Sequence, residues 1–135
     1  MGWVFDLDGV IWRGDEPIAG ASQAIGTLLA GGEDVLFVTN MSALEAAEVE
    51  TKLARHGIDG RGRVVTSAQA AASLVEPGER VLVCAGDGVR AAVLARGASP
   101  VEPAVGADRS GALDGGRVVA LEFRREPALD HRAGD

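Results

Sequence analysis

The sequence of 135 residues is poor in cysteine, in lysine and in long apolar runs, and each scarcity excludes a class of protein. Cys84 is the only cysteine, so an intramolecular disulfide is excluded, and its apolar surroundings predict a buried structural thiol. No segment approaches the roughly 20 apolar residues of a membrane helix, and the chain enters a strand-like run at once without a basic segment. We therefore expect a soluble, cytoplasmic protein with no membrane partner.

Basic residues are also in deficit. Thirteen Lys and Arg residues face 20 Asp and Glu residues, which gives a formal net charge of −7, and Lys52 is the only lysine. No basic patch is available to neutralise phosphates, so a nucleic-acid partner is not expected. The hydrophobic content of 47 % indicates a globular chain, and its length suffices for one modest domain with a core.

Apolar runs and turn residues predict strands that alternate with helices. Residues 9–17 suit a small β flap around Gly14-Asp15. We expect Trp3–Phe5 to be a buried strand and Val35–Val38 to be buried on both faces. The other expected strands are Val64–Val65, Val81–Cys84 and Val118–Leu121. The expected helices are Ala21–Ala30, a helix capped by Ser42 that ends near Gly57, a helix capped by Ser67 that runs to Val75, and Val89–Arg96. This alternation predicts an α/β fold with a parallel sheet.

Two carboxylates, Asp6 and Asp8, follow the first strand one residue apart and precede Gly9. Like charges placed together raise the cost of ionising both, and a divalent cation removes that cost. Asp6 could act as a nucleophile towards phosphorus and Asp8 as an acid and base, with Mg²⁺ as the hard cation. The alternative is a solvated Asp pair in a turn. The position after a hydrophobic strand favours the catalytic interpretation.

Thr39 and Asn40 end the next strand, directly before the predicted Ser42 cap. A hydroxyl and an amide beside a helix N-terminus can hold a phosphate through free N–H groups. An ordinary turn with a Ser cap is the alternative. Because ligands bind beyond the carboxyl ends of parallel strands, we expect Asp6, Asp8, Thr39 and Asn40 to gather at one edge of the sheet.

The segments Phe5–Val10 and Phe37–Asn40 resemble the first two motifs of the haloacid dehalogenase (HAD) superfamily, in its class IIA phosphatase branch. Further similarity lies in residues 11–14, 18–21, 65–68 and 81–88. The resemblance implies a Rossmann-like core and hydrolysis of a small phosphorylated metabolite with Mg²⁺. It implies that Asp6 is nucleophile and metal ligand, that Asp8 is acid and base with its carbonyl on the metal, and that Thr39 and Asn40 bind the phosphate.

The resemblance covers only an N-terminal portion of such a phosphatase. We expect residues 1–78 to be the first half of the core, 79–121 the beginning of an α/β cap, and 122–135 a divergent, poorly ordered tail. Family members carry a later Lys and a later acidic motif. Lys52 is expected in mid-helix and cannot be that Lys, and Asp87, Asp108 and Asp114 are expected in turns of the cap. His56 is expected at a helix end and His131 in the exposed tail.

Met41 also departs from the branch, which usually has a second Asn there. Without the later Lys and acids, the chain is expected to be weak or inactive alone. Two alternatives stay open at this point: a vestigial fragment that serves as a binding or interaction module, and one half of a split phosphatase. Such a chain would associate with a complementing chain or with itself. The particular phosphate ester is not indicated by the sequence.

Overall fold

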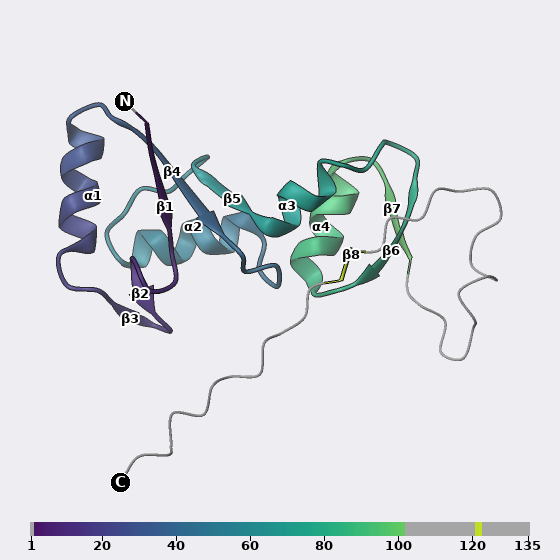
Figure 1. Cartoon of the computed structure of the whole chain (residues 1–135), viewed down its shortest axis with the longest axis horizontal. Helices are drawn as coiled ribbons and strands as arrows, with labels where there is room; N and C mark the ends of the chain where they lie inside the picture. The colour runs from purple at the N-terminus through teal and green to yellow at the C-terminus, as the bar shows by residue number, and fades with distance from the viewer. Residues whose placement is uncertain (1, 102–120, 123–135) are drawn as a thin grey trace, which may run out of the picture.

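Strands and helices alternate along the chain in a computed structural model that describes residues 2–101 and 121–122 (Figure 1). The strands are β1 (Gly2–Asp6), β2 (Trp12–Arg13), β3 (Glu16–Pro17), β4 (Asp34–Thr39), β5 (Val64–Thr66), β6 (Arg80–Cys84), β7 (Ser99–Val101) and β8 (Leu121–Glu122). The helices are α1 (Ala21–Ala30), α2 (Ala46–Arg55), α3 (Ser67–Ala72) and α4 (Asp87–Ala95). This order confirms the predicted α/β class.

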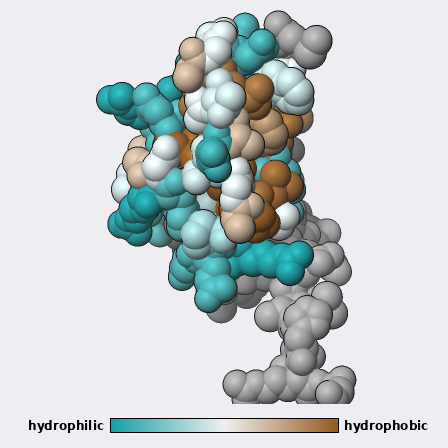
Figure 2. Space-filling view, turned by 90° about the vertical axis from the view of Figure 1, so that its left-hand side faces the viewer, coloured by the Kyte–Doolittle hydropathy of each residue, from teal (hydrophilic) through white to brown (hydrophobic). Residues whose placement is uncertain are grey.

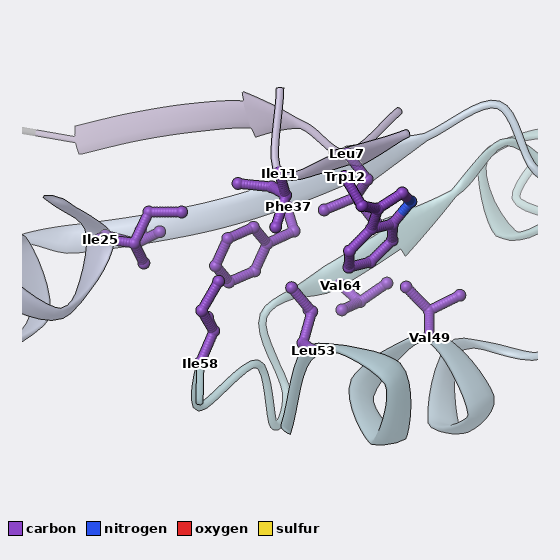
Figure 3. Close-up of a cluster of buried hydrophobic side chains, with 10 residues drawn as sticks. Leu7, Ile11, Trp12, Ile25, Phe37, Val49, Leu53, Ile58 and Val64 are labelled. Carbon is purple, nitrogen blue, oxygen red and sulfur yellow. The ribbon is translucent and has the colours of Figure 1, made fainter. Parts of the chain in front are cut away.

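The first sheet is parallel and has the strand order β1-β4-β5. The connections from β1 to β4 and from β4 to β5 each move one strand over in the same direction along the sheet. Because such crossovers are right-handed, α1 and α2 lie on the same face of the sheet. The packing agrees, because Ile25 of α1 and Val49 and Leu53 of α2 share one buried cluster with Phe37 of β4 (Figure 3). This cluster is the core beneath the edge where the predicted site residues lie.

The opposite face of this sheet is largely exposed. Val4 of β1 is 64 % exposed, and Leu36 of β4 and Val65 of β5 are 36 % and 37 % exposed. In Figure 2, hydrophobic surface gathers on the side that corresponds to the front of Figure 1, where this sheet lies. Parallel sheets of α/β proteins are ordinarily covered on both faces.

The exposure of this face corrects two predictions. Trp3 is 40 % exposed, so Trp3–Phe5 is not a buried strand. Burial alternates along β4, with Val35 and Phe37 buried and Leu36 outward, so this strand is buried on one face only. The continuous apolar run was typical of a doubly covered strand. Within the described residues, only the face that packs against α1 and α2 is covered by helices.

The predicted flap is confirmed. Strands β2 and β3 pair antiparallel, with Trp12 opposite Pro17 and Arg13 opposite Glu16. The two-residue loop between them begins with Gly14, whose φ of 60° is the left-handed conformation that a type II′ hairpin turn needs at this position.

A second parallel sheet has β6 between β7 and β8. Helices α3 and α4 pack with β6 around a second buried cluster that includes Ala72, Val81 and Val93. Helix α4 begins two residues before the predicted Val89, at Asp87, which is therefore helical rather than in a turn. Strand β7 was missed, because its three residues include Pro100, which is tolerated on an outer strand but carries no strand signal.

Cys84 is exposed, so the prediction of a buried thiol was wrong. Side chains alternate along β6, and Val81 and Val83 take the buried positions while Cys84, at the strand end, points outward. An apolar run by itself does not reveal which residues face the core.

Two helix starts also differ from prediction. Helix α2 begins at Ala46 with Glu45 as N-cap and Glu48 completing a capping box, three residues beyond the predicted Ser42 cap. Helix α3 is capped by Thr66 rather than Ser67 and ends at Ala72 rather than Val75. In both cases two residues within three positions of each other offered a capping pattern. Helix α1 matches its predicted bounds, and His56 caps the end of α2 as expected.

Several predictions fall outside the described residues. They are residues 118–120 of the expected last strand, Asp108, Asp114, His131 and residues 123–135 of the tail. The boundary at residue 78 stays a prediction. Within the described ranges, no helix has the length and apolar character needed to cross a membrane.

Candidate active site

The loop after β1 is held by backbone hydrogen bonds around Leu7. The Leu7 carbonyl accepts N–H groups from Val10, Ile11 and Trp12 at 3.3, 2.8 and 3.2 Å, and its side chain is buried. Gly9 takes a φ of 83° and donates its N–H to the Trp12 carbonyl at 2.7 Å. A non-glycine residue would be strained at this φ, so Gly9 allows the chain to turn directly after the two carboxylates.

Asp6 lies at the carboxyl end of β1, level with Val38 of β4. Its side chain is exposed, and Oδ1 accepts the Leu7 N–H at 2.8 Å. Asp6, Thr39 and Asn40 line one open depression, together with Val38, Val65, Thr66, Ser67 and Ala70. The structure therefore brings three of the four predicted site residues together at the edge of the sheet where ligands bind in parallel α/β folds.

Thr39 and Asn40 are anchored differently. Thr39 is only 6 % exposed, and its Oγ1 accepts the Met41 N–H at 3.1 Å, which leaves its hydroxyl proton free to donate. Asn40 is exposed, and its backbone carbonyl accepts the Ser67 hydroxyl at 3.0 Å. The loop that carries these two polar groups is thus tied both to itself and to the start of α3.

The predicted helix start at Ser42 is wrong, because α2 begins at Ala46, so its N-terminal N–H groups do not directly follow Thr39 and Asn40. In the capping box that starts this helix, the Glu48 carboxylate accepts the Glu45 N–H at 2.9 Å. Thr66 and Ser67 also line the depression, although neither was predicted to be a site residue. The available signal was their position directly at the end of the third parallel strand.

Asp8 lies apart from this lining. Its Oδ1 accepts the Trp12 indole N–H at 3.0 Å, so the carboxylate is held towards the flap. Lys52 is in mid-helix, as predicted, and contacts the flap rather than Asp6: its Nζ donates to the Gly14 carbonyl at 2.7 Å and lies 3.3 Å from Asp15 Oδ1.

The donor set at the end of β1 suits Mg²⁺. Asp6 and Asp8 would supply a carboxylate and a carbonyl oxygen, and no group of three or more His, Cys, Asp or Glu side chains that could hold a metal occurs in the described ranges. A Zn²⁺-type cage of side chains is therefore not present there. Mg²⁺ commonly takes only one or two carboxylates and keeps waters and substrate phosphate oxygens as its other ligands.

Comparison with known proteins gives a consistent result. A family model described as haloacid dehalogenase-like hydrolase matches residues 3–99. An acid sugar phosphatase from Staphylococcus saprophyticus is 39 % identical over 99 residues, which cover 70 % of this chain and 38 % of the relative. Human chronophin is 35 % identical over 107 residues, covering 72 % of this chain and 36 % of that protein.

A solved structure resembles the fold at similar coverage. The crystal structure of glycerol phosphate phosphatase from Mycobacterium tuberculosis in complex with magnesium superposes with a TM-score of 0.67 and 36 % identity, over 74 % of this chain and 31 % of that one. This chain thus spans well under half the length of these three proteins. The predicted resemblance to the class IIA branch, over an N-terminal portion, is confirmed.

Proposed function

Because this chain belongs to the haloacid dehalogenase-like hydrolase family, we propose that it carries the first catalytic groups of a Mg²⁺-dependent phosphomonoester hydrolase that works through an aspartyl-phosphate. The observation that carries the proposal is the grouping of Asp6, Thr39 and Asn40 around one depression at the carboxyl ends of adjacent parallel strands. The substrate class is a small phosphorylated metabolite, in keeping with the sugar and glycerol phosphatases among its relatives.

In the first step, Asp6 attacks the phosphorus atom and the bond to the ester oxygen breaks. Its Oδ1 already accepts the Leu7 N–H, which orients the carboxylate and leaves Oδ2 to form the new bond. Asp8 gives its proton to the departing alkoxide, so a neutral alcohol leaves. The product is an acyl phosphate on Asp6.

In the second step, a water molecule attacks the same phosphorus atom while Asp8 takes the proton of that water. The acyl–phosphate bond breaks, Asp6 regains its carboxylate, and inorganic phosphate departs. The Thr39 hydroxyl and the Asn40 amide donate to phosphate oxygens in both steps. Mg²⁺, held by the Asp6 carboxylate and the Asp8 carbonyl, would supply charge neutralisation for the phosphoryl oxygens.

We propose further that this chain alone is a weak catalyst. Several preorganised groups must stabilise a phosphoryl transition state together, and no lysine follows Lys52 in this sequence. The matched length is only 38 % of the acid sugar phosphatase and 28 % of a D-glycerol 3-phosphate phosphatase. The remaining cationic and acidic groups would come from polypeptide beyond these residues.

A chromogenic phosphatase assay with and without Mg²⁺ tests the proposal. We expect slow turnover of p-nitrophenyl phosphate that requires Mg²⁺ and disappears in Asp6→Asn, a variant of nearly identical shape. Arg13→Met, which removes an exposed flap charge outside the proposed machinery, is the control for protein quality. Turnover that persists unchanged in Asp6→Asn would refute the assignment of the nucleophile.

The exposed face of the first sheet favours a second function, association with another chain, either a second copy or a complementing chain. Val4, Leu36 and Val65 together form an apolar surface, and β1 pairs with β4 along one edge only. Unpaired edges and apolar faces attract further strands and helices. Light scattering after size exclusion should show self-association that falls in a Leu36→Lys, Val65→Lys double variant. A compact monomer before and after the change would argue against association with a second copy and against a vestigial interaction module.

A further inference from the structure

Trp12 links the flap to one of the two proposed catalytic carboxylates. It is 1 % exposed, and its indole Nε1–H donates to Asp8 Oδ1 at 3.0 Å. From this contact we propose that Trp12 is a positioning residue for Asp8, and that Lys52 of α2 holds Trp12 in place. The catalytic consequence rests on the role proposed above for Asp8, whereas the positioning itself does not.

The indole is suited to this task by its chemistry. Its N–H is a donor only, so it orients the Asp8 carboxyl without taking up or releasing a proton. With Oδ1 engaged, Oδ2 remains to carry the proton that moves to the leaving group. The ring is fixed as well, because Trp12 belongs to the buried cluster with Leu7 and Val49 and pairs with Pro17 in the flap (Figure 3).

Lys52 contacts both the ring and the flap turn. Its Nζ lies 4.6 Å from the centre of the Trp12 ring and donates to the Gly14 carbonyl at 2.7 Å. The nearby Asp15 side chain is fully exposed, so that ion pair adds little. The Lys52 side chain is only 20 % exposed, so most of its length packs against the protein. His56, four residues after Lys52, also contacts the indole, because the centres of the His56 and Trp12 rings lie 5.5 Å apart.

Proton exchange at the indole tests the positioning without any need for turnover. In the full chain, we expect the Trp12 indole N–H to exchange at least about 10-fold more slowly than that of Trp3, which is 40 % exposed. Asp8→Ala should remove most of this protection, whereas Asp8→Asn, which keeps an acceptor oxygen, should retain it. Lys52→Met should weaken the protection, and Arg55→Met, an exposed cation of the same helix, should not.

Leaving-group dependence tests the catalytic consequence. An alkyl phosphate needs a proton on its departing oxygen, whereas p-nitrophenolate leaves without one. Replacing Trp12 by the isosteric benzothienylalanine, which lacks the N–H, should therefore lower kcat/KM on an alkyl phosphate by about 10-fold or more, and on p-nitrophenyl phosphate by less than about threefold. Trp12→Phe should act in the same direction, and Trp3→Phe should change neither value.

The outcomes separate the two proposals. Equal losses on both esters would show that Trp12 has a merely structural role in turnover. Unchanged indole exchange in Asp8→Ala would overturn the positioning itself. If the wild-type chain turns over neither ester, the catalytic proposal for this chain fails, and the exchange data alone then decide whether Trp12 and Lys52 hold the Asp8 carboxyl.

Discussion

Gly88 in the first turn of α4 lies against the segment that follows the proposed phosphate-binding residues. Its N–H donates to the Ala43 carbonyl at 3.3 Å. A Cβ atom at this position would lie 2.5 Å from the Leu44 carbonyl oxygen and 2.6 Å from that of Ser42. Both contacts involve backbone atoms, which cannot rotate away as a side-chain end can.

The size of the effect follows from these distances. An ordinary contact begins near 3.4 Å, so Gly88→Ala has to separate the helix from the loop by roughly 0.9 Å. Overpacking of this kind costs about 1–3 kcal/mol of unfolding free energy, which outweighs the roughly 1 kcal/mol that alanine gains over glycine in a helix. Gly26→Ala, in the middle of α1, meets no atom within 4 Å and should instead stabilise the chain by about 0.5–1 kcal/mol.

Urea denaturation followed by circular dichroism measures both variants against the wild type. The midpoint should fall for Gly88→Ala and rise for Gly26→Ala, with similar m values. If Gly88→Ala is as stable as the wild type or more stable, the close approach of α4 to residues 42–44 is not part of the folded chain in solution. A change in m for either variant would indicate an altered unfolded or native state rather than a local contact.

Other substitutions test the core and the helix cap. Phe37→Ala removes a fully buried ring from the centre of the first sheet and should lower the unfolding free energy by about 3–5 kcal/mol, a large part of a small domain's stability. Leu36→Ala, on the exposed face, should lower it by about 0.5 kcal/mol in the same denaturation assay. Glu48→Ala removes the capping box of α2 and should lower the unfolding free energy by about 1 kcal/mol, with Glu76→Ala as an exposed acidic control; equal effects would contradict the cap. Removing Mg²⁺ with a chelator should abolish turnover and leave the denaturation midpoint nearly unchanged, because in the proposed site only two chain residues and water would hold the ion.

The parts of the site that follow directly from strand periodicity were predictable. Asp6 and Thr39 both end apolar runs, and parallel strands bring their carboxyl ends to one edge, so their proximity required only the α/β assignment. The hairpin around Gly14 was predictable for a similar reason, since a Gly-Asp pair between short apolar segments carries a turn geometry of its own.

Features that depend on distant packing were not predictable. Ser42 and Glu45 both begin a capping pattern, and α2 starts at the second of them. The loop before α2 also contacts α4, because the Gly88 N–H donates to the Ala43 carbonyl. Such a contact joins residues more than 40 positions apart, and a local sequence pattern does not reveal it. The orientation of Cys84 likewise depended on which side of β6 packs against α3 and α4, which an apolar run does not specify.

The exposed sheet face and the proposed nucleophile are parts of one surface. In parallel register, Asp6, Val38 and Val65 stand side by side on the same face of neighbouring strands, and all three line the depression. A polypeptide that covers Val38 and Val65 would therefore also wall in Asp6 and exclude water from it. Electrostatic stabilisation of a phosphoryl group strengthens when water is excluded. The low activity proposed for the isolated chain thus has two linked causes, missing charged groups and a missing cover, and a complementing chain that supplies the cover should raise kcat even before it adds a charge.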